Sequence, residues 1–229
     1  QHPIILAPMD PAAGGRLANA VTGAGGLGLI GGGYGDAERI EHEFREAGNA
    51  RIGGGFITWS MAKAPHLLDL MLKHNPVAVC LSFGDPRPFA PSIKAAGALL
   101  ICQIQSRQDC FEALEAGADV VIAQGAEAGG HGVRRATMTL VPEIADLLAR
   151  ESPETLLCAS GGIADGRGLA AALALGADGV MVGTRFWAAE EALVHPKKHA
   201  AGIAATGDET LRTKVTDTVR QKDWPERFN

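Results

Sequence analysis

Short apolar runs recur eight times along this chain, and segments with helical spacing, such as 107–116 and 168–175, lie between them. Continuously apolar strands that alternate with helices are typical of a parallel sheet covered by helices. The pattern therefore predicts an α/β fold with eight strand-then-helix units. The predicted strands are 4–7, 27–31, 52–58, 77–83, 99–104, 120–123, 156–159 and 180–182.

Eight units in 229 residues leave about 29 residues for each unit, which is close to the minimum for a (β/α)8 TIM barrel. We predict one such barrel domain over 1–229, with a short C-terminal tail from about residue 207. An open, doubly wound sheet is the alternative, because the number of strands alone does not exclude it.

Several predicted helices end on the same signal. Ala-Gly-Ala occurs at 96–98 and 116–118, Leu-Gly-Ala occurs at 175–177, and Gly48 forms a fourth case. Glycine just after the last helical residue is typical of a left-handed C-cap. Each of these glycines is therefore predicted to end a helix just before the next strand.

Composition limits the partners of the chain. The net charge is −5 and the pI is about 5.8, which argues against nucleic acid or an anionic membrane as a partner. No apolar segment reaches the roughly 18–20 residues that span a bilayer, and no signal peptide is visible. The four cysteines lack C-x-x-C spacing. We expect buried, reduced thiols in a cytoplasmic protein.

The unusual chemistry of the sequence follows the predicted strands. Active sites of such barrels lie at the carboxyl ends of the strands. The sixth strand leads into AQGAEAGGHGVRRA at 123–136, where His131 stands between Gly130 and Gly132. Three glycines around one histidine indicate that something other than a side chain approaches the backbone there.

An anion site is predicted after the seventh and eighth strands. Ser160, Gly161 and Gly162 can expose backbone N–H groups, Asp165 can cap the following helix, and Gly183-Thr184 adds further donors. Loops at these two places form the usual phosphate site of such barrels. The alternative reading is two tight turns in which glycine is needed for a positive φ.

Other motifs are absent or unconvincing. The sequence has no P-loop, no nucleophile elbow and no metal-ligand spacing, so no metal is predicted. GAGGLG at 23–28 precedes a strand, and its glycines are predicted to end the first helix. The ligand is therefore expected to be a phosphorylated organic cofactor or substrate.

Three motifs together resemble the nitronate monooxygenase family, also called 2-nitropropane dioxygenases. They are PIILAPM at 3–9, GAEAGGHG at 125–132, and SGGIADGRG with LGADGVMVGTRF at 160–168 and 175–186. The resemblance also includes GGLGLIGGG at 25–33. It implies an FMN-dependent flavoprotein oxidoreductase with a (β/α)8 barrel. Such an enzyme uses O2 to oxidise alkyl nitronates, such as propionate 3-nitronate, or nitroalkanes, to carbonyl compounds plus nitrite or nitrate.

The resemblance also implies site residues. His131 matches the active-site histidine of the family, which removes a proton α to a nitro group or helps to bind a nitronate; the alternative is a histidine bonded to a neighbouring loop. Glu127 either orients His131 or faces water. The resemblance assigns to the FMN site Ala7, Pro8, Met9, Gln103, Gln124, Ala128, Gly129, Gly130, Ser160, Gly161, Gly162, Gly183 and Thr184.

Two departures from the family pattern affect the pocket. Where many relatives have an asparagine near the end of the third strand, this chain reads FITWS at 56–60, so Thr58 or Trp59 is expected to reshape the pocket. Relatives commonly continue beyond DWPERFN at 223–229. Three readings follow: a more open pocket, a pocket completed by a partner subunit in a homodimer, or a shortened chain.

Three rival functions stay open. The nearest is an FMN-dependent enoyl-acyl-carrier-protein reductase, which takes electrons from NAD(P)H. The second is a flavin-free barrel isomerase or synthase that uses the same loops for a phosphorylated substrate. The third is a flavin-binding protein without catalytic activity.

Overall fold

Eight parallel strands form one sheet in the computed structural model, which describes residues 2–228. The strand order is β1-β8-β7-β6-β5-β4-β3-β2. A bridge between Ile5 and Leu27 joins β1 to the segment before β2 and nearly closes the barrel. The predicted barrel is confirmed, and the open sheet is wrong. The strands are Ile4–Leu6, Leu29–Gly33, Gly53–Ile57, Ala78–Ser82, Leu99–Ile104, Val120–Gln124, Leu156–Ser160 and Gly179–Val182.

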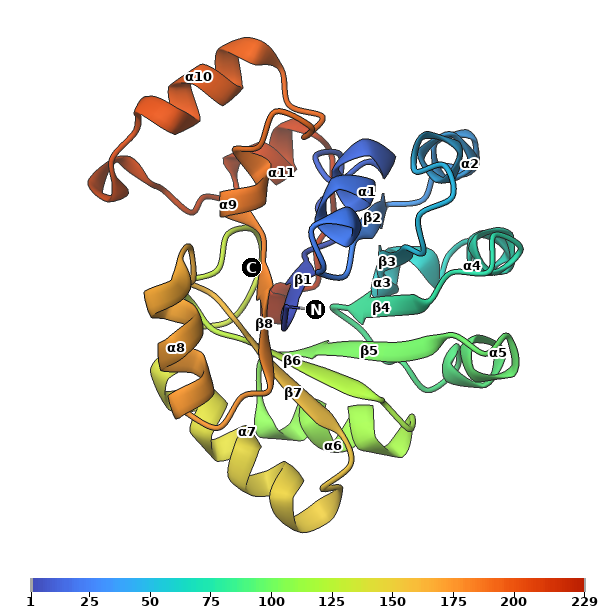
Figure 1. The fold of residues 1–229 in the computed structure, drawn as a ribbon, viewed down its shortest axis with the longest axis vertical. Helices are drawn as coiled ribbons and strands as arrows, with labels where there is room; N and C mark the ends of the chain where they lie inside the picture. Colours follow the sequence, from blue (N-terminus) through green and yellow to red (C-terminus); the bar gives the residue numbers. More distant parts are fainter. Residues whose placement is uncertain (1, 229) are drawn as a thin grey trace.

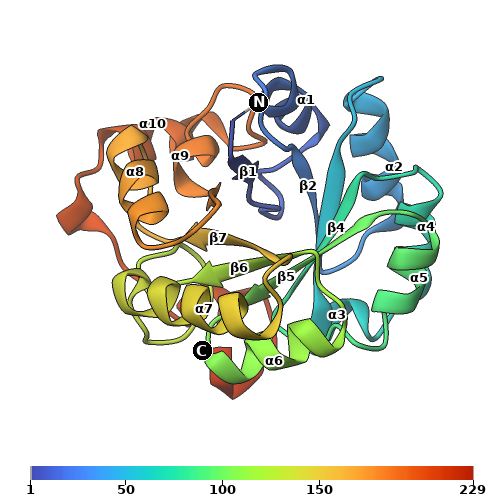
Figure 2. The ribbon, with the colours of Figure 1, turned by 60° about the horizontal axis from the view of Figure 1, so that its bottom comes forward.

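Helices surround the strands, as Figures 1 and 2 show. The longest described helix, α7 (Thr137–Glu151), packs on β6 and β7. The other α-helices, α1 to α6 and then α8 to α11, are Gly15–Gly23, Ala37–Glu46, Thr58–Met61, His66–Leu72, Ala90–Ala95, Arg107–Glu115, Gly166–Ala174, Thr184–Trp187, Pro196–Ala204 and Val215–Val219. Two 3-10 helices, Gly207–Glu209 and Glu226–Phe228, lie in the C-terminal part. Among residues 2–228, no helix combines the length and the apolar character that crossing a membrane requires.

The predicted glycine caps end the helices. Gly97, Gly117 and Gly176 have φ values of +74°, +74° and +95°, and Gly48 has +62°. After each of the first three, the next N–H donates back into the helix; for example, Ala118 N donates to Ala113 O at 3.0 Å. This pattern satisfies carbonyls that the helix itself leaves free. The repeated signal therefore sets the turns at the amino ends of the strands.

Alternate strand residues face opposite sides of the barrel wall. One buried cluster, including Ile101, Ile122 and Met181, fills the inside, and a larger one lies between strands and helices. Counting by two from the inner residues places Ser82, Gln103, Gln124 and Ser160 on the inner face at the carboxyl ends. The interior therefore changes from apolar to polar as it approaches the mouth.

The four cysteines are buried and free, as predicted. Burial raises the pKa of Cys80, Cys110 and Cys158 to about 12 and raises that of Cys102 further. Because only the thiolate is nucleophilic, we expect the folded protein to resist a thiol reagent at pH 8. The same reagent should titrate all four thiols in guanidinium chloride. Rapid labelling of the folded protein would contradict the closed packing around these strands.

The C-terminal part of the chain returns to the mouth of the barrel. Trp224 Nε1 donates to the Tyr34 hydroxyl at 2.8 Å, and Arg212 Nη2 donates to Ala126 O at 3.0 Å. We call residues 212–228 the covering segment, because it lies over the loops that follow the strands.

Candidate active site

The loops after β6 and β7 are joined at their bases. Gly125 N donates to Ser160 O at 2.8 Å, and the Thr137 hydroxyl lies 3.2 Å from Gly161 O. An ideal Cβ on Gly125 would lie 2.0 Å from the Thr137 hydroxyl oxygen, so only glycine allows this approach. The first glycine of the GAEAGGHG motif therefore holds two loops together, whereas Gly130 at φ +77° faces open space.

Backbone donors are free at the predicted anion site. Among residues 2–228, the N–H groups of Gly161, Gly162 and Gly183 have no hydrogen-bond acceptor. Gly129 lies beside Thr184, since an ideal Cβ on Gly129 would be 3.1 Å from the Thr184 hydroxyl. Loops six, seven and eight thus meet around unused N–H groups, which are good ligands for a phosphate.

Asp165 caps α8 as predicted, and it accepts from Arg167 N at 2.9 Å and Gly168 N at 3.3 Å. The carboxylate therefore occupies the N–H groups at the start of this helix. Any anion held here would depend on the glycine loops instead.

Glu127 does not orient His131; it is exposed, as the second of the two expectations had it, and it also caps a helix. Its Oε2 accepts from the backbone N and the hydroxyl of Thr137, both at 2.9 Å, so it satisfies a free donor at the start of α7. Burial alone would raise the pKa of Glu127, but these hydrogen bonds outweigh burial and hold the pKa below its ordinary value.

Glu127→Ala is therefore expected to cost about 0.5–1 kcal/mol of unfolding free energy at pH 7, because an exposed capping carboxylate is screened by water. A lowered folded-state pKa gives stability that is present above the unfolded value and lost as pH falls through the folded value. The difference from wild type should shrink below about pH 4.5 in urea titrations. Glu127→Gln keeps an acceptor and should lose less; a constant difference down to pH 3 would contradict this role.

Three glutamines form a chain beneath the histidine loop. Gln103 Nε2 and Gln105 Nε2 both donate to Gln124 Oε1 at 2.9 Å, and Gln124 Nε2 donates to His131 O at 3.1 Å. Gln124 thus fixes the backbone of His131. We did not predict Gln105, although the alternation in QIQS at 103–106 places it on the same face as Gln103.

His131 itself is half-buried and has two close partners. Its Nε2 lies 2.9 Å from Asp217 Oδ2, and its ring stacks on Trp224 with centroids 3.4 Å apart and an interplanar angle of 9°. Both partners belong to the covering segment. Neither partner could be predicted from the sequence, because nothing local connects residues so far apart in the chain.

An aromatic cluster surrounds the histidine. Tyr34, Trp59 and Phe83 make edge-to-face contacts with Trp224, and Phe228 makes one with Phe83. Phe83 has a φ of +63°, which is rare for a bulky residue and costs energy. Burial raises the pKa of Tyr34. The cluster makes the surroundings of His131 apolar on one side.

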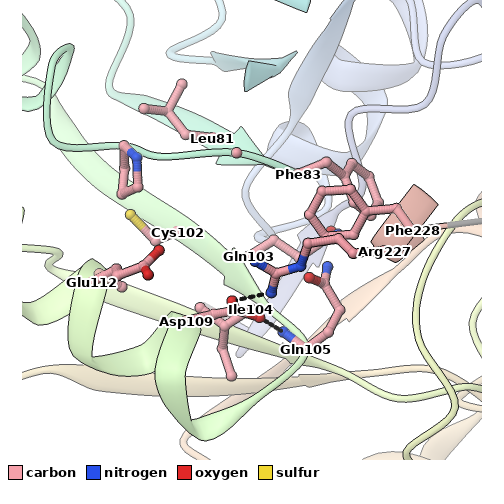
Figure 3. Close-up of a pocket in the computed structure, with 13 residues that line it drawn as sticks. Leu81, Phe83, Cys102, Gln103, Ile104, Gln105, Asp109, Glu112, Arg227 and Phe228 are labelled. Carbon is pink, nitrogen blue, oxygen red and sulfur yellow. Dashed lines mark hydrogen bonds and ion pairs between the residues drawn. The ribbon is translucent and has the colours of Figure 1, made fainter. Parts of the chain in front are cut away.

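A small cavity lies beside this cluster. Figure 3 shows it between β4, β5, α6 and the end of the covering segment, with Arg227 paired to Asp109 and Phe228 beside Phe83. Its volume is about 20 Å³, which is enough for about one water molecule. The covering segment is therefore fastened at its far end.

The predicted site residues Ala7, Pro8 and Met9 follow β1 directly and lie beside β8 and β3. Ala7 N donates to Val182 O at 2.9 Å, and Met9 Sδ would lie 3.5 Å from a Cβ on Gly183. Pro8 packs against Gly55, where a Cβ would come within 2.5 Å of the proline ring. Residues 7–9 thus adjoin the β8 loop, next to the predicted phosphate donors.

Two buried polar atoms at the end of β3 lack partners among the described residues: Thr58 Oγ1 and Trp59 Nε1. Buried polar groups are rarely left unpaired. Together with the free N–H groups of loops seven and eight, these orphaned atoms fit a mouth built to receive a polar ligand. Both atoms belong to the FITWS stretch at 56–60, where the sequence departs from the pattern of the family that it resembles.

Comparison with known proteins identifies the family. The family model described as nitronate monooxygenase matches residues 59–222. The chain belongs to the nitronate monooxygenase family. This family of oxidoreductases includes a nitronate monooxygenase of Neurospora crassa, which is 34% identical over 93% of this chain and 67% of its own length. The nitronate monooxygenase npaC of Metarhizium robertsii is 36% identical over 99% of this chain and 71% of its own length.

Solved structures support the same fold. FabK from Thermotoga maritima superimposes with a TM-score of 0.85 at 34% identity, covering 93% of this chain and 68% of that protein. The chain thus spans about two thirds of the length of the proteins that it resembles. The recognition of the family from three motifs is confirmed.

Proposed function

We propose that this chain binds FMN at the barrel mouth and oxidises alkyl nitronates or nitroalkanes with O2. The family consists in general of flavin enzymes. The observation that carries the proposal is the meeting of His131 with the glycine loops at one end of the barrel. The free N–H groups of Gly161, Gly162 and Gly183 support a phosphorylated cofactor rather than an unphosphorylated one.

Different residues of the chain bind the phosphate, leave space for the flavin ring and contact the substrate in this proposal. FMN supplies a two-electron acceptor that O2 can reoxidise. The phosphate is held by the backbone of loops seven and eight with the Thr184 hydroxyl. Gly129 and Gly130 leave room for a ring system, and residues 7–9 line its other side. His131 binds the nitronate anion, or takes the proton of a neutral nitroalkane.

An anaerobic absorption spectrum of the FMN-loaded protein tests the proposal. Propionate 3-nitronate is expected to bleach the flavin bands, and admission of O2 should restore them with release of nitrite or nitrate. NADH without nitronate serves as the control and should bleach slowly. Flavin bands that stay unchanged after addition of the nitronate would overturn the proposed substrate class.

The second candidate is an FMN-dependent enoyl-acyl-carrier-protein reductase, which the likeness to FabK favours. In that case NAD(P)H would bleach the flavin rapidly and nitronates would not. A protein that stays colourless after incubation with FMN would instead favour a flavin-free enzyme acting on a phosphorylated substrate.

A further inference from the structure

We propose that Asp217 is a positioning residue for His131 and holds its ring in the tautomer that carries the proton on Nε2. Nδ1 is then the nitrogen that meets the substrate. This inference rests on the proposed function for its chemistry, but not for its geometry. Asp217 comes from α11 in the covering segment, 86 positions away from His131.

The hydrogen-bond chemistry assigns the proton. An ionised carboxylate can only accept hydrogen bonds, so the 2.9 Å contact between Asp217 Oδ2 and Nε2 requires that Nε2 donate. Among the residues that the structure describes, none forms a hydrogen bond with Nδ1. In neutral imidazole the second nitrogen then carries a lone pair, which makes it the basic atom.

Two further contacts fix the orientation of the ring. The near-parallel Trp224 indole, 9° from the plane of the imidazole, covers one face of His131, and the Trp224 N–H is tied to Tyr34. The carbonyl of His131 is held by Gln124. The backbone, the ring plane and one ring nitrogen of His131 are therefore all constrained. The imidazole has little freedom to flip and so to interchange the positions of Nδ1 and Nε2.

Asp217 is itself held in position by burial and by the structure of the covering segment. Asp217 is 9% exposed, and its carbonyl accepts from Lys222 N at 2.9 Å within the covering segment. Arg212 bonds to the carbonyls of Ala126 and Ala128 in the histidine loop. The covering segment therefore contacts the histidine loop at two places, through Arg212 and through Asp217. In the sequence, Asp217 lies between Arg212 and Trp224, which belongs to the aromatic cluster.

The consequence for the reaction is specific. With a neutral nitroalkane, the C–H bond α to the nitro group breaks, and its electron pair stays on the substrate as the nitronate. The proton forms a new bond to Nδ1. The resulting imidazolium is stabilised by Asp217 through Nε2–H, as an orienting carboxylate stabilises a catalytic histidine.

The test reads the tautomer directly. In protein labelled with [15N]histidine, studied at pH 8.5 with and without FMN, the His131 signals are assigned by their loss in His131→Ala. We expect a protonated Nε2 and an unprotonated Nδ1 in the wild type. Asp217→Ala should average the two nitrogens, whereas Asp217→Asn, whose amide oxygen still accepts, should retain the wild-type pattern.

Asp208→Ala is the matched control, because Asp208 is an exposed carboxylate of the C-terminal part in the 3-10 helix Gly207–Glu209. It should leave the spectrum unchanged. A proton on Nδ1 in the wild type, or an unchanged pattern in Asp217→Ala, would overturn the assignment. Far-UV circular dichroism verifies that each variant is folded.

Kinetics give an independent readout. Asp217→Ala is expected to lower kcat for nitroethane by about 10-fold or more with little change in KM, since an unoriented base loses catalytic efficiency. Equal kcat in wild type and Asp217→Ala would count against a positioning role. If the protein does not oxidise nitro compounds at all, the proposed function fails, while the nitrogen spectrum still decides the tautomer.

Discussion

His131→Ala is expected to lower kcat/KM for a neutral nitroalkane such as nitroethane by about 10²–10⁴-fold, the usual contribution of a general base. The loss for propionate 3-nitronate should be smaller, about 10-fold, because a nitronate has already lost the proton that His131 would remove and loses only a binding partner. The comparison of the two substrates therefore separates proton transfer from anion binding. Oxygen consumption by the FMN-loaded protein measures both rates.

The matched control for this prediction is His42→Ala, since His42 is exposed on the outer helix α2. That variant should keep wild-type kinetics. The flavin content of His131→Ala should also match the wild type, because the predicted phosphate donors belong to other loops. Equal losses for the two substrates would show that His131 binds the anion without acting as a base.

Gly125→Ala is expected to lower the unfolding free energy by about 3 kcal/mol, the upper range for overpacking. The added Cβ would lie 2.0 Å from the Thr137 hydroxyl and 2.3 Å from the Thr137 backbone nitrogen. Backbone at the start of a buried helix cannot retreat as a flexible side chain can. The same substitution should also separate loops six and seven, so FMN affinity should fall with stability.

Two glycines serve as comparisons in the same urea titrations. Gly130→Ala meets no atom within 4 Å but must keep a φ of +77°, so it should cost about 1–2 kcal/mol. Gly207→Ala has open space and no positive φ, and should change stability little. If Gly125→Ala cost no more than Gly130→Ala, the close contact with Thr137 would not be decisive.

The barrel could be predicted because its signals are local. Each strand is a short apolar run, and each of Gly97, Gly117 and Gly176 ends a helix through hydrogen bonds that span only a few residues. The proximity of the loops around Gly161 and Gly183 could be predicted from the same strands, since parallel strands bring their carboxyl ends to one face.

The partners of His131 could not be predicted in this way. Asp217 and Trp224 lie in a stretch without strong apolar periodicity, and their contacts join positions 86 to 190 residues apart. The capping role of Glu127 was not predicted for a related reason: its partner Thr137 begins the next helix, whereas the prediction considered only the distance of Glu127 from His131 along the sequence.

The covering segment also has a consequence for biosynthesis. The bonds from Arg227 to Asp109 and from Trp224 to Tyr34 close loops of 118 and 190 residues, and a ribosome delivers the later partner only after every barrel strand has been made. Domains generally fold from the amino end as they emerge. The scaffold can thus assemble around an open mouth before Asp217 and Trp224 reach His131. Translation order therefore leaves an interval in which a ligand can enter before the covering segment docks.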